Sequence, residues 1–238
     1  MRRLFWYAVP CGLLFFATPN AHGQLTATWE QVRDPSVGGR VTSISVSPHD
    51  ASRVLIGGDV LGIGLSTDGG DSWGSTFGLQ NWEVSQFTWH PTDPDTVWVG
   101  TLGGPYVSHD AGRTWSPQRA GLPPIEPFDY AAPIEKVLFD PNNANRLVAL
   151  GGNSRRQSVD GDSLFGAVWT SNDAGNSWNY LTTLFGNGST NARPLDRGEN
   201  IVGATFLAGS SNTLLLAADG RGVLRSFDLV GGTFGVSN

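Results

Sequence analysis

The octet "STDGGDSW" (residues 66–73) joins a polar, glycine-containing head to a tryptophan, and it recurs as "SHDAGRTW" (108–115) and "SNDAGNSW" (171–178). Glycine supplies the positive φ that a tight turn needs, and aspartate, serine and threonine side chains form hydrogen bonds within such a turn. The closing tryptophan is predicted to be the first inward residue of the next strand, packed between neighbouring sheets. The octets are therefore predicted to be hairpin corners, which are structural elements and not catalytic sites.

Each octet is part of a longer repeat. The segments "SPHDASRVLIGG", "HPTDPDTVWVGT" and "DPNNANRLVALGG" precede the three octets, and a degenerate fourth copy keeps Ser226 and Asp228. Short apolar strands repeated at a period of roughly 40 to 60 residues are typical of β-propeller blades. We predict an all-β fold, a β-propeller with about four blades of four antiparallel strands, at residues 41–80, 85–120, 134–183 and 200–238.

A further strand is expected at residues 25–32 ("LTATWEQV"), before the first blade and without partner strands of its own. The blades are therefore expected to form a partial ring with unpaired edges, as in a fragment of a longer propeller. A small ring closed by this strand and an assembly of subunits are the alternatives.

The first 23 residues have the three parts of a secretory signal peptide. Two arginines precede an apolar run (residues 4–17), and small residues precede a predicted cleavage site between Gly23 and Gln24. We expect removal of residues 1–23, a secreted or periplasmic location, and no membrane association afterwards; an uncleaved anchor is the alternative. The only cysteine, Cys11, lies in this segment, so the mature chain would have neither disulfides nor a cysteine nucleophile.

Composition narrows the classes of partner. Charged residues make up 15% of the 238-residue chain, its net charge is −6, and no basic run is present. A nucleic-acid partner is therefore not expected. The four histidines do not occur at metal-ligand spacing, so neither a metal nor another cofactor is predicted.

The pattern S-x-D-[GA]-G-x-[TS]-W resembles the Asp-box, or BNR repeat, of sialidases, sortilin-type receptors, photosystem assembly factors and xyloglucanases. The resemblance implies a β-propeller but no single activity, because unrelated activities share the box. A sialidase is disfavoured, because the arginine cluster that would bind the substrate carboxylate is missing. The residues to which the resemblance gives a structural role are Ser66, Asp68, Gly70, Trp73, Ser108, Asp110, Gly112, Trp115, Ser171, Asp173, Gly175 and Trp178.

Activity is expected at the opposite end of the blades from the octets. Propellers usually bind ligands on the face formed by the loops between their second and third strands and between blades. The irregular segments 116–133, 153–164 and 182–200 fall there, although neutral variation in loop length is an alternative. Aromatic side chains that could stack on sugar rings are Trp82, Phe128 and Tyr130, with packing within the loops as the alternative.

The segment "GGDVLGIG" (57–64) resembles the D-[VI]-G-G-x-Y segment of glycoside hydrolase family 74 xyloglucanases. The resemblance implies that Asp59 is the general base of an inverting reaction, which also needs a second carboxylic acid roughly 6.5–9.5 Å away. Only Asp59, Val60 and Gly62 match, and no motif identifies the acid. The alternative is that Asp59 caps its own turn. Asp219 precedes Ser226 of the fourth repeat by the same number of residues as Asp59 precedes Ser66.

Two functions remain open on the sequence. One is an exported, family-74-like glycoside hydrolase acting on xyloglucan or a related β-glucan, of which this chain is the amino-terminal part. The other is a non-catalytic propeller that binds a protein or a glycan.

Overall fold

The structure is a computed structural model that describes residues 39–60, 62–125, 127, 129–152, 166–183, 201–218, 222–229 and 233–236. The expected signal peptide (1–23), the expected strand at 25–32 and the candidate Phe128 lie outside the described residues. The same holds for the segment 153–164 and for most of the segment 182–200.

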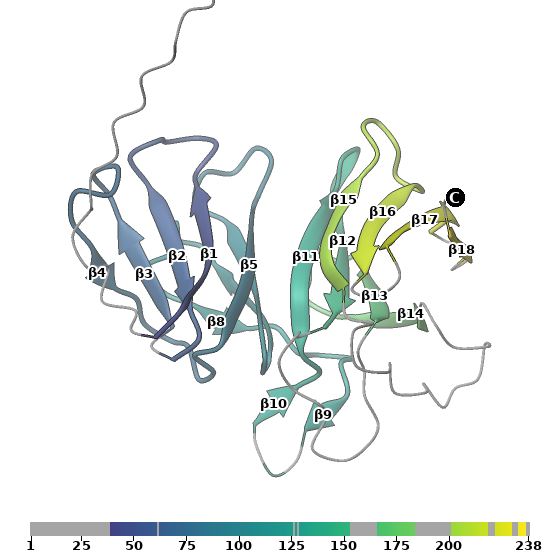
Figure 1. Cartoon of the computed structure of the whole chain (residues 1–238), viewed down its shortest axis with the longest axis horizontal. Coiled ribbons are helices and arrows are strands. Elements are labelled where there is room, and N and C mark those ends of the chain that lie inside the picture. Colours follow the sequence, from purple (N-terminus) through teal and green to yellow (C-terminus); the bar gives the residue numbers. More distant parts are fainter. Residues whose placement is uncertain are drawn as a thin grey trace, which may run out of the picture. The chain divides into compact units, whose positions relative to one another are not determined.

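Four antiparallel four-stranded sheets confirm the predicted all-β propeller fold (Figure 1). The first blade has the order β1 (Val41–Val46), β2 (Val54–Gly58), β3 (Ile63–Ser66), β4 (Gly74–Ser75). The second has β5 (Val84–Trp89), β6 (Val97–Thr101), β7 (Gly104–Ser108), β8 (Ser116–Pro117). The third has β11 (Ile134–Asp140), β12 (Asn143–Gly151), β13 (Ala167–Ser171), β14 (Asn179–Thr183). The fourth has β15 (Ile201–Phe206), β16 (Leu214–Ala218), β17 (Gly222–Asp228), β18 (Thr233–Val236). A short separate hairpin lies between the second and third blades in the chain and consists of β9 (Pro124–Ile125) and β10 (Tyr130–Ala131).

The hydrophobic core lies between consecutive blades. One cluster joins the first and second blades, a second joins the second and third, and a third joins the third and fourth. The second strand of the second blade, β6, is buried on both faces, because a blade packs against each side of it. Each blade therefore has two apolar faces, one toward the preceding blade and one toward the following blade.

The three octets form the corners between the third and fourth strands of their blades. In the first, the Ser66 hydroxyl donates to Asp68 Oδ1 at 2.8 Å and accepts from Gly70 N at 2.9 Å, and Asp68 Oδ1 accepts from Ser72 N at 2.9 Å. Asp110 and Asp173 make the same contacts in their own octets. The aspartates thus close their own turns, which leaves them occupied by structural hydrogen bonds.

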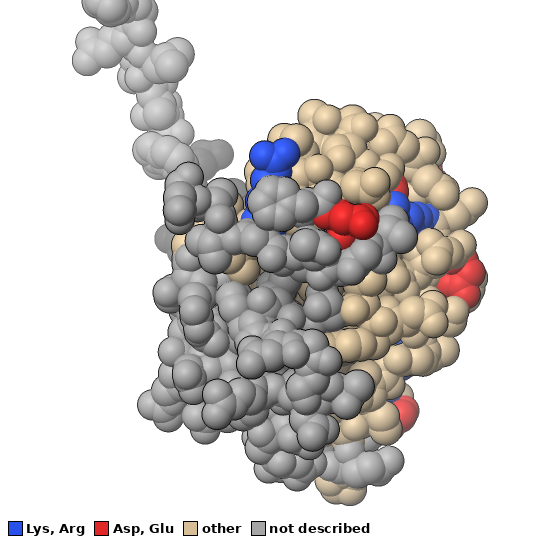
Figure 2. All heavy atoms as spheres, turned by 90° about the vertical axis from the view of Figure 1, so that its right-hand side faces the viewer, with Lys and Arg blue, Asp and Glu red and all other residues tan. Residues whose placement is uncertain are grey.

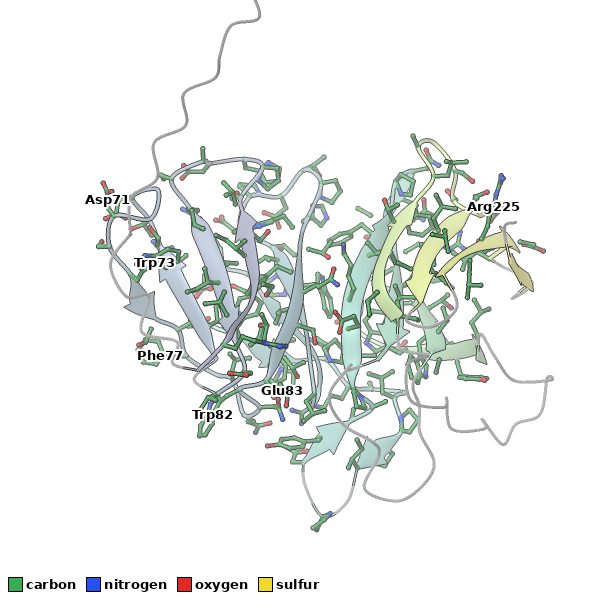
Figure 3. All side chains as sticks on the ribbon, in the orientation of Figure 1. Asp71, Trp73, Phe77, Trp82, Glu83 and Arg225 are labelled. Carbon is green, nitrogen blue, oxygen red and sulfur yellow. The ribbon has the colours of Figure 1, made fainter. Side chains whose placement is uncertain are left out.

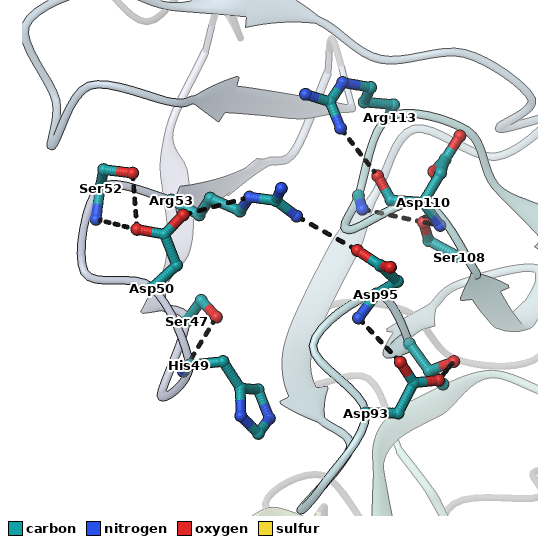
Figure 4. A network of polar contacts seen from close by, with 12 residues as sticks. Ser47, His49, Asp50, Ser52, Arg53, Asp93, Asp95, Ser108, Asp110 and Arg113 are labelled. Carbon is teal, nitrogen blue, oxygen red and sulfur yellow. Dashed lines mark hydrogen bonds and ion pairs between the residues drawn. The ribbon is translucent and has the colours of Figure 1, made fainter.

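Polar contacts also join the blades at the octet end (Figure 4). Arg53, on the turn before β2, lies 3.5 Å from Asp50 of its own turn and 3.5 Å from Asp95 of the second blade. The Asp95 carbonyl in turn accepts a hydrogen bond from Ala111 N in the second octet, at 2.8 Å. The octet end is therefore cross-linked through its own side chains and backbone.

A glycine after the fourth strand of a blade lets the chain approach the next octet. Gly78 has φ +93° and Gly121 has φ +86°, and a Cβ on either would lie within about 2 Å of the carbonyl oxygen of Trp115 or Trp178, respectively. The same tryptophans donate their backbone N–H groups to Phe77 O (2.9 Å) and Ala120 O (2.8 Å). Each of these blade junctions therefore requires a glycine at this point.

The three octet tryptophans do not have the same surroundings. Trp115 and Trp178 are buried and belong to the clusters between blades, in line with the sequence expectation. Trp73 is only partly buried and belongs to none of these clusters, because no described blade precedes the first one. The expectation that the tryptophan packs between neighbouring blades therefore does not hold for Trp73 within the described part of the chain.

Candidate functional site

The loops at the end opposite the octets bring several predicted residues together. A Cβ built on Gly62, in the connection that holds Asp59, would lie 3.5 Å from Trp82 Cδ1. A Cβ built on Gly103, between β6 and β7, would lie 2.9 Å from Asn81 Cβ and 3.0 Å from Tyr130 Cδ1. We call this region, with Asp59, Gln80, Trp82, Arg119 and Tyr130, the loop-end surface.

Trp82 is the exposed aromatic residue of the loop-end surface (Figure 3). Its side chain is 59% exposed, although tryptophan is among the side chains that gain most from burial. The backbone beside it is held in place, because buried Asn81 accepts a hydrogen bond from Glu83 N through its Oδ1 at 3.1 Å. Trp82 is thus an accessible indole carried on a well-supported loop.

Asp59 is partly buried and is engaged by the backbone at the start of the first blade. Its Oδ1 accepts a hydrogen bond from Arg40 N at 2.8 Å, and its own N–H donates to Arg40 O at 3.1 Å. A Cβ on Gly39 would lie 2.4 Å from Asp59 Oδ1, so the carboxylate packs directly on this backbone. These contacts tie Asp59 to the segment just before β1, 19 positions earlier in the chain. The capping of its own turn and the role as general base both stay predictions.

Arg119 holds the loop-end surface together, and sequence reasoning missed it. Its guanidinium donates to Tyr106 OH at 2.6 Å and to Gln80 Oε1 at 3.0 Å, and it also donates to Asp129 O. It lies 5.3 Å from the ring centre of Tyr106 and 6.0 Å from that of Tyr130. Tyr130 OH completes the group by donating to Gln80 O at 3.3 Å, so Tyr130 is fixed against the loop that carries Trp82.

A second unpredicted polar group joins three blades through their first strands. Gln86 Nε2 on β5 donates to Glu135 Oε1 on β11 at 2.9 Å and to Val202 O on β15 at 2.8 Å. Burial raises the pKa of Glu135 above its usual value of 4.5, although hydrogen bonds from Gln86 and Ser85 and the nearby charge of Lys136 oppose the shift. The only sign of this polar group in the sequence was a glutamate within the apolar run "IEKVLF".

A hollow of about 400 Å³ lies elsewhere, at the outer strands of the first blade. Leu65, Trp73, Phe77 and Arg113 contribute to its lining. None of the residues of the loop-end surface lines it, so the predicted site and this hollow are separate features.

Two kinds of feature are absent from the described ranges. They contain no group of three or more histidine, cysteine or acidic side chains that could hold a metal ion. Nor do they include a helix with the length and apolar character needed to cross a membrane.

A family model agrees with the repeat and the fold. The Sortilin-Vps10 family, described as "Sortilin, neurotensin receptor 3,", matches residues 61–201, which is more than half of the chain. The chain belongs to the Sortilin-Vps10 family. The match spans all three octets in full, so the resemblance to Asp-box propellers is confirmed.

Solved structures place this Sortilin-Vps10 chain among longer propeller proteins. An ancestral GH74 enzyme is 26% identical over 87% of the chain and 25% of its own length, with a TM-score of 0.64. A GH74 enzyme of Niastella koreensis is 18% identical over 81% of the chain and 28% of its own length, with a TM-score of 0.55. An auxiliary nutrient binding protein of Bacteroides thetaiotaomicron is 14% identical over 79% of the chain and 38% of its own length, with a TM-score of 0.51.

This Sortilin-Vps10 chain therefore spans about a quarter of the length of the two GH74 enzymes. No curated protein sequence matches it. The matches at lower identity show the fold alone, and any activity has to be argued from the residues at the loop ends.

Proposed function

We propose that the chain is an exported propeller whose loop-end surface binds a polysaccharide, with Trp82 as the platform on which a sugar ring stacks. The observation that carries the proposal is the 59% exposure of an indole on a fixed loop. Exposed aromatic faces bind the apolar faces of sugar rings, while polar groups beside them select hydroxyl positions.

The surroundings of Trp82 supply such polar groups. Gln80, Arg119 and Asp129 form one hydrogen-bonded network with Tyr106 and Tyr130. The carboxylate of Asp129 is highly exposed and lies 3.4 Å from the Arg119 guanidinium. The network therefore offers both donors and acceptors to a polar, uncharged ligand next to the indole. The likeness to an ancestral GH74 enzyme, at 26% identity, supports a β-glucan as the polysaccharide.

Binding of soluble xyloglucan, measured by isothermal titration calorimetry and by affinity electrophoresis, tests the proposal. Trp82→Ala is expected to weaken binding by about fivefold or more, because a stacked aromatic side chain contributes on the order of 1 kcal/mol or more. Phe77→Ala is the matched control, since Phe77 is 70% exposed but lies at the hollow and not at the loop end (Figure 3). Equal binding by Trp82→Ala and the unaltered chain would refute the assignment of Trp82.

A hydrolase is the second candidate function, and two observations favour it. Asp59 lies on the same loop as Gly62, on which an added Cβ would lie 3.5 Å from Trp82 Cδ1. The likeness to an ancestral GH74 enzyme extends over most of the chain. An inverting glycosidase would use Asp59 to activate water, with a second carboxylic acid supplied across the cleft. The activity would then belong to a longer protein or an assembly that contributes the acid.

Release of reducing ends from xyloglucan separates the two candidates. Asp59→Asn keeps an oxygen that can accept the Arg40 N–H bond, so the fold is expected to remain intact. If Asp59 is the base, turnover falls by about 1000-fold or more while binding is retained. Unchanged turnover in Asp59→Asn removes that role, and binding without any turnover favours the non-catalytic module.

A further inference from the structure

The turn between β5 and β6 is held by the imidazole ring of its first residue. His90 Nδ1 accepts hydrogen bonds from Thr92 N at 3.2 Å and from Asp93 N at 2.9 Å. His90 N donates to Thr96 O at 2.9 Å, which joins the two ends of the turn. One ring nitrogen therefore binds two backbone N–H groups that lie outside the strands, as a serine or aspartate side chain does in a comparable turn.

Oxygen atoms occupy the same place in two neighbouring blades. Ser47, His90 and Asp140 each directly precede a proline at the end of the first strand of a blade. Ser47 Oγ accepts from His49 N at 3.2 Å, and Asp140 Oδ1 accepts from Asn142 N at 2.9 Å. A hydroxyl or ionised carboxylate oxygen retains a lone pair at neutral pH, whereas an imidazole nitrogen loses its lone pair when histidine binds a proton, between about pH 8 and pH 5. Of these three turns, only that of the second blade depends on an acceptor that titrates near neutral pH.

Two more histidines lie next to this turn, and both are hydrogen-bond donors. His49 Nε2 lies 2.8 Å from His90 O, and a carbonyl oxygen can only accept. His109 Nδ1 lies 3.0 Å from Thr96 Oγ1, whose hydroxyl proton is already donated to Asp93 Oδ2 at 2.6 Å. A second proton on either ring leaves these contacts in place. Among these three histidines, only His90 needs an unprotonated nitrogen for the contacts that it makes.

The His90 turn, residues 90–96, contacts both neighbouring blades. The His90 carbonyl accepts from His49 of the first blade. The His90 ring packs edge-on against the uncharged ring of Phe139 in the third blade, with 4.8 Å between the ring centres. Asp95 of the same turn lies 3.5 Å from Arg53 of the first blade (Figure 4). Loosening of the His90 turn therefore weakens contacts of the second blade on both of its sides.

The charges around His90 oppose the loss of these hydrogen bonds only in part. Asp93 is ionised, because the hydrogen bond from the Thr96 hydroxyl, and to a smaller extent the charges of His90 and His109, lower its pKa. Its carboxylate attracts a protonated His90, whereas a protonated His49 repels it. The side of the molecule in Figure 2 carries scattered charged groups among uncharged residues, so near neighbours dominate the charge around His90. An ion pair between partly exposed groups contributes little, whereas the proton removes two hydrogen bonds from backbone N–H groups at once.

We propose that the His90 turn is a pH-sensitive element, which joins the first three blades while His90 is neutral and opens when His90 Nδ1 binds a proton. In the open turn Nδ1 is free to take a proton from water, whereas in the closed turn its lone pair binds two N–H groups. A falling pH therefore favours the open turn. The octet corners stay closed over the same pH range, because the pKa of Asp68 and that of Asp173 are about 2.

Hydrogen–deuterium exchange of the full chain at about pH 7.5 and about pH 5.5 tests the proposal. Protection of the Thr92 and Asp93 amides, corrected for the intrinsic dependence of exchange on pH, is expected to fall about tenfold or more at the lower pH, because the proton removes both hydrogen bonds. Ser72 N, which donates to Asp68 in the first octet, is the internal reference and is expected to keep its protection. Equal protection of Thr92 and Asp93 at the two pH values overturns the proposal.

Two substitutions separate the acceptor from the aromatic ring. His90→Asn supplies an amide oxygen that accepts at both pH values, so the protection of Thr92 and Asp93 is expected to change by less than about twofold. His90→Phe keeps a ring against Phe139 but has no acceptor, so the protection is expected to be low at both pH values. If protection in His90→Asn falls as steeply as in the unaltered chain, the acceptor at residue 90 is not the cause and the proposal is wrong.

Two further measurements assign the proton to His90. His109→Asn keeps an amide donor for Thr96 and is expected to show the same fall in protection as the unaltered chain. Loss of the pH dependence in His109→Asn would assign it to the neighbouring histidine and contradict the proposal. The ¹⁵N chemical shifts of the His90 ring are expected to show a proton on Nε2 alone at about pH 7.5. A proton on Nδ1 at that pH would exclude the two accepted hydrogen bonds.

Discussion

At the scale of the residue, the octet aspartates are held ionised by the turns that they close. Hydrogen bonds from the Ser72 hydroxyl and backbone N–H, and then from Ser66, lower the pKa of Asp68 to about 2 from an ordinary value of 3.8. Hydrogen bonds from Ser171 and then Ser177 lower the pKa of Asp173 to about 2 as well. These carboxylates therefore serve turn closure and not proton transfer at neutral pH.

Because folding lowers the pKa of these carboxyl groups, the folded chain is predicted to lose stability at low pH. A carboxyl group whose pKa is lowered by folding stabilises the folded state above its unfolded pKa, and this contribution is lost as the pH falls through the folded pKa. We expect the free energy of unfolding to fall between about pH 4 and pH 2. A variant with Asp68→Asn and Asp173→Asn should be less stable at neutral pH and should show a shallower fall. Urea unfolding at a series of pH values measures how the free energy of unfolding changes with pH in the unaltered chain and in the variant. If it falls equally steeply with pH in both, Asp68 and Asp173 are not the cause of the loss at low pH.

At the scale of the element, the blades are joined by close backbone approaches at single glycines. Gly121 has positive φ and leaves no space for a Cβ beside the Trp178 carbonyl. Gly69 also has positive φ, at +78°, but nothing lies within 4 Å of its Cβ position. The other two octets have alanine at the place of Gly69, and Ala111 and Ala174 adopt φ values of +57° and +58°. A positive φ alone is therefore tolerated here, and the close contact decides which glycine is required.

Gly121→Ala is predicted to destabilise the chain by about 3 kcal/mol or more, because the added methyl group forces the two blades apart. Gly69→Ala is the matched control and is expected to cost about 1 kcal/mol or less, since it reproduces the alanine of the other octets. Chemical unfolding of the two variants gives the comparison. Similar losses in both would mean that backbone strain, and not the blade contact, is responsible.

At the scale of the whole molecule, one glutamine side chain ties three blades together. Gln86 satisfies the Glu135 carboxyl group of the third blade and the Val202 carbonyl of the fourth. Because burial raises the pKa of Glu135, the ionised carboxylate costs stability as the pH rises through its folded pKa. The Gln86 amide donates a hydrogen bond to the carboxylate and offsets part of this cost. The stability that this hydrogen bond contributes therefore depends on pH.

Gln86→Ala is predicted to lower the free energy of unfolding by about 1–3 kcal/mol at pH 7, because it leaves the carboxylate without this donor. The loss should be smaller near pH 4, where Glu135 binds a proton and is no longer charged. Thermal and urea unfolding at both pH values measure the difference, with Gln118→Ala as a glutamine control on the second blade. If the loss of stability is the same at both pH values, Gln86 does not act through the ionised carboxylate of Glu135.

The loop-end surface was only partly predictable. The period of the repeat placed Asp59, Trp82 and Tyr130 on loops at one end, because blade geometry fixes which connections share a face. Arg119 and Gln80 were not singled out, since polar residues in irregular segments carry no periodic signal. The sequence left open that Asp59 caps its own turn, and it gave no sign of the hydrogen bond that Asp59 accepts from Arg40 N, 19 positions earlier.

The sequence alone determined the blade and its corner. The hydrogen bonds of an octet join Ser66, Asp68, Gly70 and Ser72 within a few positions of one another, so neighbouring residues encode them completely. Only the tertiary structure decided which faces are covered, which glycine cannot be replaced, and that Gln86 contacts Val202, 116 residues away. Such contacts depend on side chains that packing brings together from distant segments, and no local pattern records them.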